Sequence, residues 1–100
     1  MSDEAKPAYM RVPHPEQIGK VLKTMREAMK VTREDTREYL VNKYFDEAIS
    51  TIGIVAAETR GENMKIGTLI QLADSLGFKV ILANVEAIEI LEREAVNLRR

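Results

Sequence analysis

The chain has 100 residues, of which 45% are hydrophobic and 31% charged, with 15 basic side chains against 16 acidic ones. This length suits one domain with a single core, which needs neither a disulfide nor a metal to fold. The absence of cysteine excludes disulfide frameworks and thiolate metal sites, and the single histidine argues against a multi-histidine metal centre. The net charge of −1 argues against a general polyanion binder.

The first 15 residues hold all three prolines and predict an extended N-terminal arm, because proline disfavours helix at the residue before it. The N-terminus is polar and acidic, unlike a signal peptide, and no apolar run approaches the roughly 18 residues of a membrane span. We therefore expect a cytoplasmic protein that makes no membrane contact.

Three segments have the apolar spacing of amphipathic helices. In Glu16–Met29 the apolar residues recur at i, i+3, i+4 and i+7, which predicts a helix with one buried face. The segment Arg33–Tyr44 follows Thr32, a good N-cap residue, and Asp35 three positions later completes a capping box. The third segment, Lys65–Leu76, also carries an apolar stripe and is followed by glycine, which commonly ends helices.

The middle of the chain is less clear, because the apolar run Ile49–Ala57 lacks a polar face over most of its length. Periodicity alone permits either a buried helix or a strand there. The Ala56-Ala57-Glu58 sequence and the lack of β-branched alternation after Val55 favour a helix. Arg60-Gly61 is then typical of a helix end with glycine in the left-handed conformation.

Residues 78–100 predict a strand followed by a helix. Apolar residues recur at alternate positions in Phe78–Ala83, as in a short strand. Asn84 can cap a final helix that runs to Arg100 with an apolar stripe along one side. The apolar surface of this region exceeds what a monomer of this size can easily cover, so we expect residues 78–100 to form a homodimer contact.

Four short motifs resemble the lambda-repressor-like (Cro/XRE-type) helix-turn-helix family. They are IGKVLKTMRE at residues 18–27, TRED at 32–35, ETRG at 58–61 and TLIQLADSLG at 68–77. The resemblance covers about residues 17–77 and implies a mainly all-α fold of four to five helices. A helix-turn-helix domain at residues 16–77 would be followed by the short C-terminal strand and terminal helix. The connection between the second and third helices is roughly seven residues longer than the family's tight turn.

The resemblance implies a sequence-specific double-stranded DNA-binding repressor that acts as a homodimer, encoded by a phage or in a toxin–antitoxin operon. The predicted helix in the middle of the chain would be the recognition helix, which enters the major groove. Phosphate contacts are then expected from polar and cationic side chains near this helix, namely Thr32, Arg33, Lys43 and Arg60. Base contacts are expected from Ser50 and Thr51, the polar residues at the start of that helix. Arg26 and Glu58 resemble the family's buried ion pair between the first and third helices.

A second hypothesis assigns the chain to a different class of function, the binding of a partner protein. The near-neutral charge and the apolar run Ile49–Ala57 favour a helix-turn-helix-derived protein-interaction module, such as an antitoxin or a phage-encoded inhibitor of a host protein. The sequence contains neither a glycine-rich phosphate loop nor a nucleophile–base pair, so we expect no enzymatic activity. We also expect neither a metal ion nor a cofactor.

Overall fold

The computed structural model describes residues 12 and 14–98, so the arm predicted at residues 1–15 lies largely outside the described part of the chain. The described residues are mainly helical, which confirms the all-α class. They fall into two compact units. Residues 12–80 form the first, and residues 81–98 are the described part of the second. Each unit is considered by itself below.

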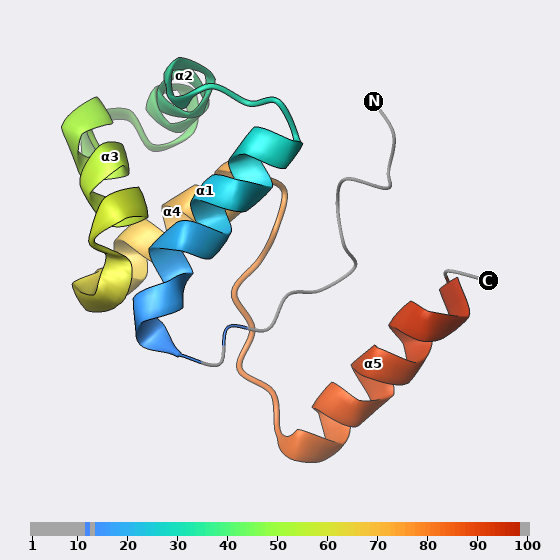
Figure 1. Cartoon of the computed structure of the whole chain (residues 1–100). Coiled ribbons are helices and arrows are strands. Elements are labelled where there is room, and N and C mark those ends of the chain that lie inside the picture. Colours follow the sequence, from blue (N-terminus) through green and yellow to red (C-terminus); the bar gives the residue numbers. More distant parts are fainter. Residues whose placement is uncertain (1–11, 13, 99–100) are drawn as a thin grey trace. The chain divides into compact units, whose positions relative to one another are not determined.

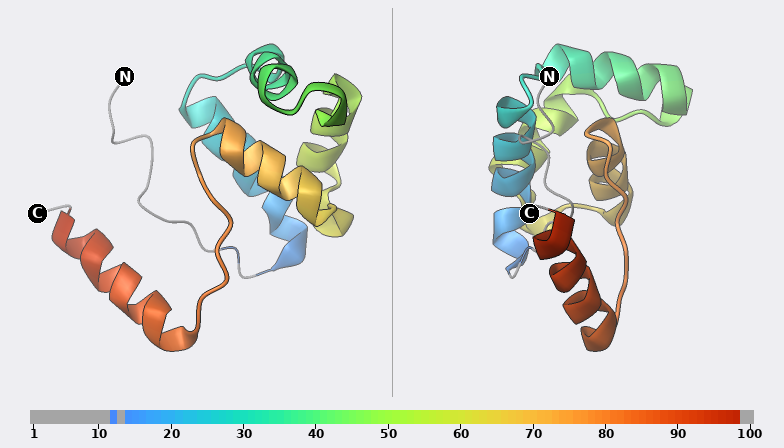
Figure 2. Two further views of the ribbon diagram at one scale, coloured as in Figure 1. Left: turned by 180° about the vertical axis from the view of Figure 1, so that it is seen from behind. Right: turned by 90° about the vertical axis from the view of Figure 1, so that its right-hand side faces the viewer.

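The unit of residues 12–80 contains four α-helices, with short 3₁₀ helices before α1, between α2 and α3, and between α3 and α4. Helix α3 contacts both α1 and α2, and α2 runs roughly across one end of α1, α3 and α4 (Figures 1 and 2). In chain order the elements are η2 (Pro15–Gln17), α1 (Ile18–Ala28), α2 (Arg33–Tyr44), η3 (Phe45–Glu47), α3 (Thr51–Thr59), η4 (Gly61–Asn63) and α4 (Ile66–Ser75).

The core of this unit draws on all four helices and includes one cluster of buried apolar side chains from α2, α3 and α4. Leu40 of α2 and Ile54 of α3 are fully buried, and Ala57 and Leu72 pack with them. Burying a leucine or isoleucine side chain stabilises a fold by about 2 kcal/mol. This small core therefore holds α3 by one side only, through Ile54 and Ala57.

The N-caps of α2 and α3 both have side chains that accept backbone hydrogen bonds, and the N-cap predicted at Thr32 is confirmed. Thr32 Oγ1 accepts from the Asp35 amide at 3.0 Å, and the Asp35 carboxylate accepts from the Thr32 amide at 3.0 Å, which completes the capping box. Ser50 Oγ accepts from the Gly53 amide at 3.0 Å. These bonds satisfy amides that have no partner within the helix, and they explain where α2 and α3 begin.

Helices α1 and α4 end in the same Schellman motif but with different residues at its left-handed position. After α1, the amides of Lys30 and Val31 donate to carbonyls of the last turn, and Lys30 has φ 59°. After α4, the amides of Gly77 and Phe78 do the same, and Gly77 has φ 83°. Glycine adopts this conformation without a steric penalty, whereas lysine does not.

Two glycines permit the closest contact between helices. A Cβ atom on Gly19 of α1 would lie 2.2 Å from the Ala57 carbonyl oxygen, and one on Gly61 would lie 2.7 Å from the Gly19 amide nitrogen. The prediction that Gly61 takes a left-handed conformation is wrong, because among the described residues Gly77 is the only glycine with positive φ. Gly61 is instead required by close packing against α1.

The segment 78–84 forms neither helix nor strand, so the strand predicted at Phe78–Ala83 is not confirmed. Alternating apolar residues form a strand only where another strand pairs with them, and the described residues contain none. In the second unit α5 (Val85–Leu98) begins directly after Asn84, whose Oδ1 accepts from the Ala87 amide at 2.8 Å. Among the described residues, no helix is long and apolar enough to cross a membrane.

Candidate nucleic-acid interface

A buried carboxylate joins the first three helices of the unit. Glu58 of α3 accepts two hydrogen bonds from Arg26 of α1, with Nε to Oε2 at 2.7 Å and Nη2 to Oε1 at 3.1 Å. Arg33, the first residue of α2, donates from Nε to Glu58 Oε1 at 2.9 Å. Arg26 Nη1 also donates to the Val31 carbonyl at 2.8 Å. The structure thus contains the expected Arg26–Glu58 pair and adds Arg33, forming what is called the Glu58 triad below.

The ionised form of Glu58 is favoured by these contacts. Burial alone would raise the pKa of Glu58, but the hydrogen bonds from Arg26 and Arg33 and their positive charges lower it below its ordinary value. The hydrogen bond to Glu58 likewise raises the pKa of Arg26. The Glu58 side chain is only 2% exposed, whereas Arg33 is 29% exposed. Two guanidinium groups on one carboxylate leave one net positive charge at this junction of helices.

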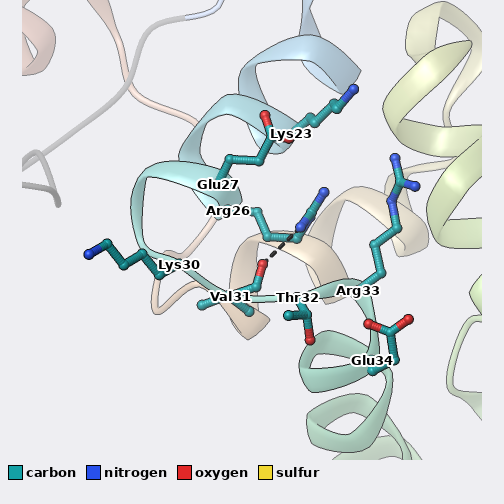
Figure 3. Close-up of a pocket in the computed structure, with 8 residues that line it drawn as sticks. All are labelled: Lys23, Arg26, Glu27, Lys30, Val31, Thr32, Arg33 and Glu34. Carbon is teal, nitrogen blue, oxygen red and sulfur yellow. Dashed lines mark hydrogen bonds between the residues drawn. The ribbon is translucent and has the colours of Figure 1, made fainter.

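A shallow, open hollow lies between the end of α1 and the start of α2 (Figure 3). Four cationic side chains and two carboxylates line it, so the hollow carries a positive excess. Its lining residues are Lys23, Arg26, Glu27, Lys30, Val31, Thr32, Arg33 and Glu34. The hydroxyl of Thr32 accepts its capping bond and can still donate a hydrogen bond, because a hydroxyl has one donor and two acceptor positions. Thr32 and Arg33, which are consecutive in the sequence, both line this hollow.

The leading end of α3 is exposed to solvent. Ser50, Thr51 and Ile52 are all exposed, and Ile52 retains 83% of its accessible surface. At the other end of the helix Arg60 is exposed as well, while the Thr59 hydroxyl donates to the Val55 carbonyl at 2.8 Å. Helix α3 therefore presents few polar groups outward, with Ser50 and Thr51 at its start and Arg60 at its end.

Lys43 does not join the other expected phosphate contacts. It lies ten residues after Arg33 on α2, which is about 15 Å along the helix axis. Its ammonium contacts the Asp74 carboxylate of α4 at 2.6 Å and lies 5.9 Å and 5.7 Å from the ring centres of Tyr39 and Tyr44. Tyr44 also donates its hydroxyl to Asp74 at 2.7 Å. Lys43, Tyr44 and Asp74 thus form a separate group, called the surface cluster below.

The pKa values of the groups in that cluster are also shifted. Hydrogen bonds from Lys43 and Tyr44 lower the pKa of Asp74, and the bond to Asp74 raises the pKa of Lys43. The Tyr44 hydroxyl donates to the same carboxylate, which raises the pKa of that hydroxyl. All three shifts favour the charge states that hold the cluster together at neutral pH.

Two polar side chains that the sequence analysis did not single out hold the connection between α2 and α3. Arg37 Nη1 donates to the carbonyls of Ala48 and Ile49 at 3.2 and 2.7 Å. Gln71 of α4 accepts from the Ile49 amide at 3.0 Å and donates to the Glu47 carbonyl at 2.8 Å. The one available signal was the position of Gln71, a polar residue inside an apolar stretch of the predicted helix.

Comparisons with known proteins add no assignment to this geometry. No family model, curated protein or solved structure matches the chain.

Proposed function

We propose that the chain binds double-stranded DNA as a helix-turn-helix regulator of the lambda-repressor-like type, with α3 entering the major groove. The observation that carries the proposal is the one-sided anchoring of α3. Ile54, Ala57 and Glu58 hold its inner side, whereas its leading end at Ser50 and Thr51 is exposed. A helix that is fixed from behind and open at its N-terminal end has the geometry needed to read base edges.

The proposed contacts divide into two kinds. Thr32, Arg33 and Arg60 bind backbone phosphates and set the position of the protein on the duplex. Ser50 and Thr51 contact base edges, and the exposed Ile52 side chain can contact a thymine methyl group. Lys43 is left out of this set, because it lies about 15 Å along α2 from Arg33 and its ammonium is bound to Asp74. Arg33 is kept, because it binds Glu58 through Nε only.

The first test is a salt titration of binding to a duplex of random sequence. With Arg33 and Arg60 as phosphate contacts, the slope of log affinity against log salt concentration should be about −2 per protomer and about −4 for a dimer. Absence of measurable binding at low salt would reject the proposal.

A pair of variants separates the two kinds of contact. Arg60→Ala removes an exposed cation that lies outside the Glu58 triad, so it should weaken binding to all duplexes alike and reduce the slope by about 1 per protomer. Thr51→Ala should leave the slope unchanged and reduce preference for a selected site over random duplex. Equal effects of both variants on preference would contradict these roles.

The proposal includes a homodimer formed through residues 78–100. This proposal is supported by Val85, Ile90 and Leu91 of α5, which are 71%, 50% and 45% exposed, whereas an amphipathic helix of a globular protein normally buries its apolar face. Sedimentation equilibrium should show a dimer at micromolar concentration. Leu91→Glu should shift the equilibrium to monomer, and Glu86→Gln, which changes an exposed polar position of the same helix, should not.

A second function is favoured by the exposed apolar side chains beside α3. Ile52 is 83% exposed and Phe45, in the connection before α3, is 74% exposed. Exposed aromatic and aliphatic side chains are typical anchors of protein interfaces. A protein-interaction module, such as an antitoxin or a phage-encoded inhibitor, would bind a partner protein through these residues and would show no salt-dependent binding to DNA.

A further inference from the structure

The connection between α2 and α3 is long but closely held. It comprises residues 45–50, and Phe45 begins it with φ 52° and ψ −123°, a conformation that residues other than glycine seldom adopt. Ala48 and Ser50 then have extended backbone, so the chain leaves η3 and reaches α3 without a further regular element. An extended segment of this kind has no internal ladder of hydrogen bonds and needs other partners to keep one conformation.

Side chains of two different helices supply those partners. Arg37 of α2 binds the carbonyls of Ala48 and Ile49, and Gln71 of α4 binds the Ile49 amide and the Glu47 carbonyl. Four hydrogen bonds therefore hold three consecutive residues directly before the N-cap of α3. These two side chains and their four bonds are called the connection clamp.

The clamp acts on the opposite end of α3 from the Glu58 triad. The triad and the Gly19 contact fix the trailing half of the helix against α1. At the leading end Ser50 and Thr51 are exposed, and the capping bond of Ser50 Oγ is made with the Gly53 amide of the same helix. Before the N-cap, side chains of both α2 and α4 hold the backbone at Ile49, and within the helix the buried Ile54 is the first residue held by the core.

We propose that Arg37 and Gln71 are positioning residues, which set the direction in which α3 presents Ser50 and Thr51 to the bases of a duplex. This inference rests on the proposed DNA-binding function. Hydrogen bonds to base edges depend steeply on distance and angle, so a small change in the direction of α3 breaks them. Contacts to phosphates by Arg33 and Arg60 depend on charge and tolerate such a change.

Gln71→Met is the deciding variant, because it removes both hydrogen bonds of Gln71 while conserving charge and approximate size. Ile70→Met is its matched control, since Ile70 is the exposed neighbour on the same helix and makes none of the clamp's bonds. The probe is a pool of duplexes with a random central segment, from which the wild-type protein enriches a preferred duplex. Affinities for the enriched duplex and for the random pool are measured at low temperature, with circular dichroism confirming equal helix content.

For Gln71→Met we expect the ratio of the two affinities to fall about tenfold, with affinity for the random pool unchanged because no charge is altered. Ile70→Met should keep the wild-type ratio. If the clamp served stability alone, both affinities would fall together with the folded fraction, and that result would overturn the proposal. An unchanged ratio for Gln71→Met would overturn it as well.

A second measurement does not depend on DNA. Because the chain has no cysteine, nitroxide labels can be attached at Lys20→Cys and Thr51→Cys, both exposed positions, and their distance distribution measured. Adding Gln71→Met should broaden the distribution, and adding Ile70→Met should not. A wild-type protein that enriches no duplex would refute the proposed function, while the label distances would still test the clamp's effect on α3. An unchanged distribution refutes the clamp itself.

Discussion

The two charged clusters of the four-helix unit use similar groups in very different surroundings. In the Glu58 triad the carboxylate is 2% exposed and is bound by two guanidinium groups from α1 and α2. In the surface cluster the Asp74 carboxylate is 22% exposed and is bound by Lys43, which is 50% exposed, and by the Tyr44 hydroxyl. A carboxylate that water can reach loses little when its partner is removed, whereas a buried one has no replacement.

Of the two clusters, the Glu58 triad is the one that holds α3 in place. The triad connects three helices around a carboxylate that is 2% exposed, so loss of Glu58 leaves the nearly buried Arg26 charge without its partner. The surface cluster connects only α2 and α4, and water can take over either partner's hydrogen bonds. Similar distances in the two clusters, 2.7 and 2.6 Å, therefore correspond to very different contributions to stability.

The largest effect is expected from Glu58→Ala. This change leaves the guanidinium of Arg26, only 10% exposed, without a counter-charge, and it should lower the free energy of unfolding by about 3–5 kcal/mol. Urea denaturation followed by circular dichroism measures it. A loss below about 1 kcal/mol would show that the triad behaves like a surface pair, and the contrast between the clusters would disappear.

The triad should also make stability depend on pH. The folded-state pKa of Glu58 is lowered, so its contribution is complete above the unfolded value of about 4.3 and is lost as pH falls through the folded-state pKa. Glu58→Gln should therefore flatten the acid limb of a plot of unfolding free energy against pH. The pKa of Asp74 is lowered too, but Asp74→Asn should change that limb less. Equal flattening by both variants would contradict the comparison.

A smaller effect is expected at the helix ends that border the clusters. Lys30 occupies the left-handed position after α1, next to Val31, whose carbonyl accepts from Arg26. Lys30→Gly should raise the free energy of unfolding by about 0.5–1 kcal/mol, and Gly77→Lys at the matching position after α4 should lower it by about 1 kcal/mol. Thermal denaturation of both variants tests this, and a loss of stability in Lys30→Gly would contradict it.

Those parts of the fold that depend on residues close together in the sequence were predictable from the sequence. The bounds of α2 agree with the prediction because Thr32 and Asp35 cap it locally. Helix α3 begins two residues later than predicted, because Ile49 is bound by Gln71 from α4 and Ser50 becomes the N-cap. A hydrogen bond between residues 22 positions apart leaves no periodic signal in the sequence.

The contacts of the candidate site also divide into those that could be expected from the sequence and those that depend on how the helices pack. The Arg26–Glu58 pair could be expected from a resemblance, but the partners of Arg33 and Lys43 could not, because Glu58 and Asp74 lie 25 and 31 residues away and approach only when the helices pack. The proposed phosphate contacts therefore omit Lys43, whose ammonium is bound to Asp74. Similarly, the role of Gly61 followed from its contact with Gly19 rather than from its local sequence.

The smallest effect is expected from Asp74→Asn in the surface cluster. The amide oxygen can still accept the Tyr44 hydroxyl bond, and the Lys43 ammonium is exposed enough to be hydrated, so the free energy of unfolding should fall by at most about 1 kcal/mol. Raising the salt concentration should reduce the difference between wild type and variant, because exposed charges are screened. Lys43→Met, measured beside it, should behave alike. A loss above about 2 kcal/mol in either variant would mean that the α2–α4 contact depends on this pair, and that exposure alone does not separate the two clusters.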